Sequence, residues 1–187
     1  MNEWLLDIGR NYLNRDRVVV ICKVLLMIPI LLIVFGLLAS KVSGDYSMIG
    51  QILQLLFDLG LAVLCIALLR VVYENNYKIP IIGYYVVVTI IKGVYLFFIT
   101  SNGTKQGELF TLIFVLSFVL HIIIGIQLLK TKFAVLGKAF LLYVGGIALG
   151  GILRASEFEG LSIIVIMLSF FILIYFFYRE LPTYYTK

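Results

Sequence analysis

Residues 109–129 have the sequence LFTLIFVLSFVLHIIIGIQLL, 21 residues without an acidic side chain, a lysine or an arginine. A helix needs about 20 mostly apolar residues to cross the roughly 30 Å hydrocarbon core of a membrane. Inside that core the backbone must satisfy its own hydrogen bonds, which a helix does within a single segment. A membrane barrel would instead need segments of about ten residues that alternate in polarity. This stretch does not alternate, and it therefore predicts a membrane-spanning helix.

Five other windows have the same character, so the sequence predicts six spanning helices. The windows run roughly over residues 18–39, 48–69, 79–100, 109–129, 134–153 and 161–178. Only short polar connections separate them. We therefore expect an all-helical membrane bundle in one domain, residues 18–187, preceded by a separate segment, residues 1–17.

The composition excludes several other classes of protein. Apolar residues make up 63% of the chain and charged residues 13%, against about 45–50% and about 25% in soluble domains. The mean hydropathy is +1.11. These values exclude a water-soluble globular domain and a disordered chain. The net charge of +5 is explained by the placement of basic residues beside the membrane, and we expect no nucleic acid partner.

The distribution of lysine and arginine predicts the orientation, because these residues accumulate on the cytoplasmic side. The side that holds the N-terminus has eleven of them, and the opposite side has three, Lys41, Lys105 and Arg154. Lys92 is the remaining one and lies inside a span. We therefore expect a multi-pass protein of the inner or plasma membrane with both termini in the cytoplasm.

The first 17 residues are too polar to cross the membrane. Trp4, Leu5, Ile8, Tyr12 and Leu13 recur at helical spacing between polar residues. This pattern predicts a short amphipathic helix on the cytoplasmic surface of the membrane. Such a helix can act as a simple anchor or as a docking element for a partner protein.

Three ionisable side chains fall inside the predicted spans: Asp58, Lys92 and His121. At 1.5 Å per residue, Asp58 lies roughly 15 Å and Lys92 roughly 12 Å from the outer ends of their spans. Helices joined by a short loop are usually neighbours. The matching depths therefore predict an ion pair between Asp58 and Lys92.

Polar side chains continue along the same helix faces. Gln51, Gln54 and Asp58 share one face of their helix, and Ser117 and His121 share a face of theirs. Polar faces of membrane helices point toward other helices or a cavity, since lipid offers no hydrogen-bond partner. We expect these residues to line a polar interior between the second, third and fourth spans.

Three interpretations of this polar interior stay open. Asp58 and Lys92 can simply join two helices, with His121 bonded to Ser117 or to a backbone carbonyl. Alternatively, the same groups can line a cavity that binds a polar solute or relays protons. Catalysis is a third possibility, but the chain has none of the motifs of hydrolases, metalloproteases or nucleotide-binding enzymes. We expect no catalytic residue, metal ion or cofactor.

The fifth span contains glycines at the spacing that allows close helix packing. Gly146 and Gly150 form a GxxxG pattern, which lets two helix backbones approach each other. The pattern does not say whether the partner is another helix of this chain or of a second copy.

Taken together, these features favour a small membrane protein that binds or transports a polar solute or an ion. The alternative is a non-catalytic subunit that assembles with other membrane proteins through the fifth span and the N-terminal helix. An intramembrane enzyme has the least support.

The predicted orientation can be tested with two cysteine substitutions in a variant without native cysteines. Lys132→Cys and Ser156→Cys lie in connections on opposite sides of the membrane. A membrane-impermeant maleimide should label Ser156→Cys in intact cells and Lys132→Cys only after the cells are opened. The reverse pattern would contradict the orientation.

Overall fold

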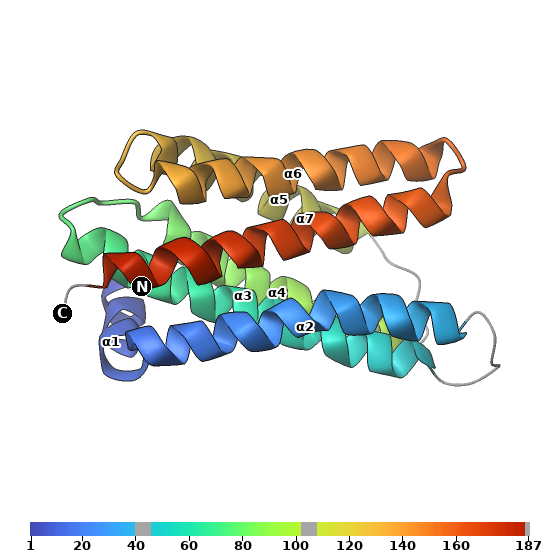
Figure 1. Ribbon diagram of the computed structural model, residues 1–187, viewed down its shortest axis with the longest axis horizontal. Helices are drawn as coiled ribbons and strands as arrows, with labels where there is room; N and C mark the ends of the chain where they lie inside the picture. Colours follow the sequence, from blue (N-terminus) through green and yellow to red (C-terminus); the bar gives the residue numbers. More distant parts are fainter. Residues whose placement is uncertain (40–45, 102–107, 186–187) are drawn as a thin grey trace.

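The computed structural model describes residues 1–39, 46–101 and 108–185. Within these ranges the side chains of residues 33–39, 46–51, 99–101, 108, 110 and 159 are not described. The described residues form helices and contain no strand, as predicted. The helices are α1 (Asn2–Tyr12), α2 (Arg15–Ala39), α3 (Tyr46–Glu74), α4 (Ile81–Ser101), α5 (Glu108–Leu129), α6 (Ala134–Ala155), α7 (Glu159–Glu180) and the short 3₁₀ helix η1 (Leu181–Tyr184) (Figure 1).

Five helices, α3 to α7, are long and apolar enough to cross a membrane, counted among the described residues. Five of the six predicted windows therefore lie in helices that could cross a membrane. Helix α2 has 25 residues, but the side chains of its last part are outside the described residues. The sixth crossing, over residues 18–39, therefore stays a prediction.

Two helices have ends that differ from the predicted windows. Helix α3 continues through Glu74, past the expected end at residue 69. A hydropathy window stops at a charged residue, whereas the helix continues because Arg70 and Glu74 pair one turn apart at 2.7 Å. Helix α4 begins at Ile81, directly after Pro80, because a proline disfavours the helical conformation of the residue before it, here Ile79.

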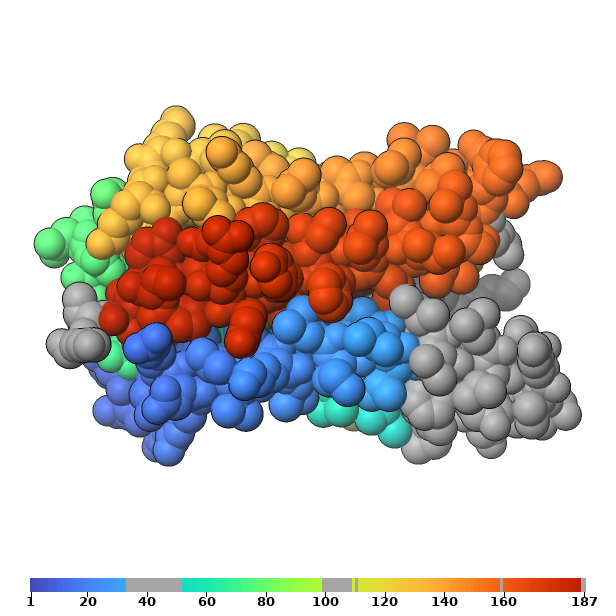
Figure 2. All heavy atoms as spheres, viewed as in Figure 1, coloured from blue at the N-terminus to red at the C-terminus, as the bar shows by residue number. Residues whose placement is uncertain are grey.

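The six long helices pack in a closed ring. Each contacts the next one along the chain, and α2 also contacts α7, which closes the ring. Figure 2 shows α7 filling the surface between α2 and α6. Short connections favour this arrangement, since they make consecutive helices antiparallel neighbours. The fully buried side chains inside the ring include large aromatic residues: Phe57, Tyr85, Phe140 and Phe177.

Helix α1 covers one end of the ring and packs against α3. Both chain termini lie at this end (Figure 1). The predicted apolar face is divided between two environments. Leu5 and Leu13 are buried in the protein together with Leu6, whereas Trp4 is 65% and Tyr12 is 62% exposed. The helix is therefore attached to the bundle by its leucines and presents its aromatic residues outward.

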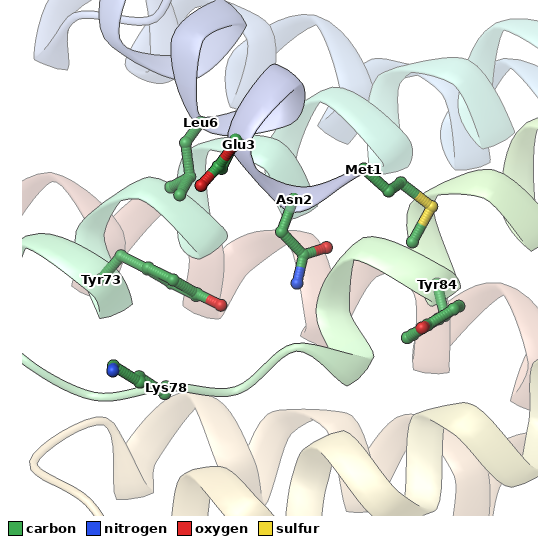
Figure 3. Close-up of a pocket in the computed structure, with 7 residues that line it drawn as sticks. All are labelled: Met1, Asn2, Glu3, Leu6, Tyr73, Lys78 and Tyr84. Atoms are coloured by element: carbon green, nitrogen blue, oxygen red, sulfur yellow. The ribbon is translucent and has the colours of Figure 1, made fainter.

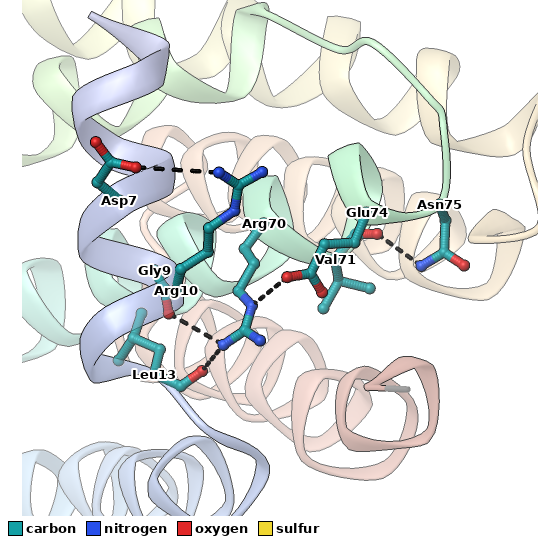
Figure 4. A network of polar contacts seen from close by, with 8 residues as sticks. All are labelled: Asp7, Gly9, Arg10, Leu13, Arg70, Val71, Glu74 and Asn75. Atoms are coloured by element: carbon teal, nitrogen blue, oxygen red, sulfur yellow. Dashed lines mark hydrogen bonds and ion pairs between the residues drawn. The ribbon is translucent and has the colours of Figure 1, made fainter. Parts of the chain in front are cut away.

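Arg70 holds the end of α1 in place (Figure 4). Its Nη1 atom donates hydrogen bonds to the backbone oxygens of Gly9, at 3.2 Å, and Leu13, at 2.7 Å. These carbonyls belong to the last turn of α1 and its C-terminal cap, where a positive charge is favourable. The Arg70 guanidinium also lies 5.1 Å from the centre of the Tyr185 ring. Burial raises the pKa of Tyr185 to about 12, with the Glu74 carboxylate adding to the shift and Arg70 opposing it. Arg70 therefore joins α1, α3 and the C-terminal segment.

The GxxxG pattern packs α6 against α7 of the same chain. A Cβ atom at Gly146 would lie 1.7 Å from Ser169 Oγ, and one at Gly150 would lie 2.4 Å from Ile166 Cγ1. The Ser162 hydroxyl donates a hydrogen bond of 2.7 Å to the Gly150 carbonyl. The close approach of these two helices therefore requires both glycines.

Two neighbouring glycines give a matched test of this packing. Gly146→Ala should destabilise the protein by about 1–3 kcal/mol, because the new methyl group overlaps Ser169. Gly145→Ala places its methyl group where no atom lies within 4 Å, and alanine favours a helix over glycine. Thermal unfolding in mild detergent should show a loss only for Gly146→Ala; equal effects would contradict the packing.

Candidate functional site

The centre of the bundle contains a buried ion pair between α3 and α4. Lys92 Nζ lies 2.8 Å from Asp58 Oδ1, and the two side chains are 8% and 0% exposed. The ion pair predicted from depth is therefore confirmed. Gly93 allows this approach, since a Cβ atom there would lie 3.0 Å from Asp58 Cβ.

The Asp58 carboxylate has few hydrogen bonds for a buried charge. Gln54 Nε2, one turn earlier on α3, donates to Asp58 Oδ2 at 3.4 Å. Among the described residues, the partner of Oδ1 is the Lys92 ammonium at 2.8 Å. A carboxylate can accept about four hydrogen bonds, so part of its capacity is unused. Gln51, the other predicted residue of this face, has a side chain outside the described residues.

Thr89 is a second buried polar group with unused capacity. It lies on α4, three residues before Lys92, and is 0% exposed. Its Oγ1 atom makes no hydrogen bond of good geometry among the described residues, although it lies beside the Tyr85 hydroxyl. Buried polar atoms are usually paired, and an unpaired one near an ion pair is therefore a candidate ligand contact.

His121 on α5 forms a second polar cluster with Tyr85 of α4. Its Nδ1 atom lies 2.7 Å from the Ser117 backbone oxygen, and its Nε2 atom lies 2.7 Å from the Tyr85 hydroxyl. A carbonyl oxygen only accepts, so Nδ1 carries a proton. In the neutral imidazole the Tyr85 hydroxyl then donates to Nε2. Ser117 therefore bonds to His121 Nδ1 through its backbone carbonyl. A backbone carbonyl was the second of the two partners expected for His121.

Aromatic rings enclose His121. The ring centres of Tyr85 and Tyr143 lie 4.5 Å and 4.8 Å from that of the imidazole, and Phe140 lies at 5.8 Å. Sequence reasoning did not place Tyr85 or Tyr143 beside His121. The available signal was the spacing of Tyr85, Thr89 and Lys92 at four and three residues. The spacing alone could not show which α5 and α6 residues face them.

The predicted site residues therefore fall into two neighbouring clusters. Asp58, Lys92 and Gln54 form the first cluster, which we call the charged cluster. His121, the Ser117 carbonyl and Tyr85 form the second. The charged cluster joins α3 to α4, and the second cluster joins α4 to α5, so together they involve the three helices that were expected to line a polar interior. Within each cluster the residues contact one another.

A pocket of about 430 Å³ lies elsewhere, at the end of the bundle that α1 covers. Figure 3 shows that side chains from α1, α3, the following connection and α4 point toward it. The lining residues are Met1, Asn2, Glu3, Leu6, Tyr73, Lys78 and Tyr84. Most of these side chains are exposed or half-buried, so the pocket is an open surface depression beside α1.

The electrostatics of the charged cluster limit what it can do. An unpaired charge at the centre of a membrane costs about 2.5–3.5 kcal/mol on insertion scales. The Asp58 carboxylate therefore needs one positive charge beside it, or a proton, in every state in which it stays buried.

Within the described residues, no group of three or more His, Cys, Asp or Glu side chains is arranged to hold a metal ion. No protein-family model, curated protein or solved structure matches the chain.

The ion pair can be tested by a double-mutant cycle on stability. Lys92→Met should cost about 3–5 kcal/mol, because it leaves the Asp58 charge buried without its partner. Adding Asp58→Leu should recover at least half of that loss, since a buried apolar pair avoids the desolvation of both charges. Unfolding in detergent measures both variants. Losses that simply add would contradict mutual neutralisation.

Proposed function

We propose that the protein is a cell-membrane protein with six crossings and both termini in the cytoplasm, and that it binds or transports a small polar solute or an ion. The site is the polar centre between α3, α4 and α5, with Asp58, Lys92, Gln54, Gln51, Ser117 and His121 as its residues. The observation that carries this proposal is the fully buried Asp58–Lys92 pair, whose carboxylate has unused hydrogen-bonding capacity.

Energetics favour this proposal over a purely structural role for the pair. Polar contacts between membrane helices contribute only about 0.6 kcal/mol on average. Burying both charges costs several kcal/mol of hydration, and an apolar pair of similar volume often gives equal or greater stability. Helix joining alone therefore gives little reason to place two charges there, whereas binding of a charged or polar ligand requires them.

The geometry of His121 argues against a serine-type enzyme. Such chemistry needs an imidazole nitrogen beside a serine hydroxyl. Both ring nitrogens of His121 are instead engaged, one by the Ser117 carbonyl and one by the Tyr85 hydroxyl.

A subunit of a larger complex is the second candidate function. Two observations favour it: Trp4 and Tyr12 are exposed on α1, and Gly145 and Gly151 leave open space on the face of α6 away from α7. Assembly through the fifth span would use that outer face, because Gly146 and Gly150 already contact α7. A protein that co-purifies in a fixed ratio with the chain in mild detergent would favour this alternative.

Opening of the polar centre to water can be tested by thiol labelling. In a Cys22→Ala, Cys65→Ala background, Thr89→Cys should react with a small water-soluble methanethiosulfonate in proteoliposomes, because the reaction needs a hydrated thiolate. Val86→Cys, on the same helix and equally buried, is the matched control and should stay unreactive. Mass spectrometry measures the labelled fraction.

Labelling of Thr89→Cys only after denaturation would contradict the proposal. In that case the clusters never open, and the pair serves as a contact between helices.

A further inference from the structure

We infer that the ligand of the charged cluster is a monovalent cation, which replaces the Lys92 ammonium at Asp58 while Lys92 releases a proton. This inference rests on the proposed function and names its substrate class. It predicts exchange of one cation for one proton.

The charges of the cluster set the valence of the ligand. The cluster holds one carboxylate and one ammonium, so its net charge is zero. A monovalent cation in place of the ammonium keeps the charge at zero. A divalent cation would leave one uncompensated positive charge in a low-dielectric interior, which is costly.

The neighbouring side chains that the structure describes add no further charge. Helix α2 packs Leu25 against Gly60, and α7 packs Phe170 against Phe57 near this level, both apolar. Among the described residues, the other titratable side chains near the clusters are Tyr85 from α4, Cys65 from α3, His121 from α5 and Tyr143 from α6. The two bonds of His121 fit its neutral form, with Tyr85 donating to Nε2. The balance between Asp58 and Lys92 therefore determines the charge of the site.

The oxygen atoms set the chemistry of the ligand. The buried Asp58 carboxylate has two partners among the described residues, Lys92 at Oδ1 and Gln54 at Oδ2, which leaves lone pairs unused, and Thr89 Oγ1 is buried nearby on α4. Gln54 lies within 3.4 Å of the carboxylate, and its amide can rotate to present oxygen. Carboxylate, hydroxyl and amide oxygens suit hard cations. Unused acceptors therefore favour a cation over an anion or a zwitterion.

The exchange step balances in atoms and charge. The contact between the Lys92 ammonium and Asp58 breaks, one N–H bond of that ammonium breaks, and the proton leaves to water. The cation then contacts the Asp58 carboxylate, and Lys92 remains as a neutral amine. The site is neutral before and after, so no net charge crosses the membrane when a cation and a proton move in opposite directions.

The test uses proteoliposomes with an acidic interior and a trapped pH-sensitive dye. Addition of NaCl, LiCl or KCl should dissipate the pH gradient for at least one of the three cations, whereas choline chloride should not. Asp58→Asn should reduce the rate to that of vesicles without protein. Lys138→Met, which changes an exposed lysine of α6, should retain the wild-type rate.

Lys92→Met tests the assigned proton carrier. Without the ammonium, a group other than Lys92 must give up the proton that leaves when the cation enters. The pH dependence of exchange should therefore differ from that of the wild type. An unchanged pH profile would overturn the role of Lys92.

A wild-type measurement keeps the inference testable if these variants do not fold. Addition of the active cation to purified protein in weakly buffered detergent solution should release close to one proton per chain. No gradient dissipation with any of the three cations, or full exchange by Asp58→Asn, would overturn the inference. If the inference fails but Thr89→Cys still reacts with the thiol reagent, the proposed function stands with another solute. If Thr89→Cys does not react, the inference and the proposed function both fail.

Discussion

Mutual neutralisation of Asp58 and Lys92 is the constraint on which the interior of this bundle depends. The pair lies between helices that are otherwise apolar, where either charge alone would be strongly unfavourable. Its 2.8 Å contact fixes the relative depth of α3 and α4. Gly93 permits the close approach, and Tyr85 and Thr89 on the same face of α4 extend the polar region toward α5. The position of His121 follows, since its ring bonds to Tyr85.

The rest of the fold encloses this polar region. Consecutive packing and the contact between α2 and α7 close the ring of helices. At one end, Arg70 ties the last turn of α1 and the C-terminal segment to α3. Hydrogen bonds to backbone carbonyls are insensitive to side-chain identity, so Arg70 fixes the position of α1 without fixing its outer face. Trp4 and Tyr12 are exposed on that outer face.

Sequence reasoning was most successful where a single segment contains the information. The spans from α3 to α7 follow from runs of apolar residues, because each membrane helix satisfies its own backbone. The Asp58–Lys92 pair followed from depth counting along two consecutive helices. The predicted end of α3 was wrong, because a hydropathy window ends at the charged Arg70 and takes no account of its ion pair with Glu74. The division of α1 into a buried and an exposed apolar part required knowledge of its neighbour α3.

The sequence by itself determined the helices, their order and the presence of charges at mid-depth, because these depend on local hydrophobicity and on a fixed rise per residue. Only the tertiary structure decided which helices close the ring, that Gly146 and Gly150 pack against α7 of the same chain, and that Tyr85 and Tyr143 surround His121. Lipid-facing and helix-facing positions carry similar apolar residues in a membrane protein. The pattern of hydrophobicity therefore does not encode the rotation of each helix, and contacts between side chains determine it.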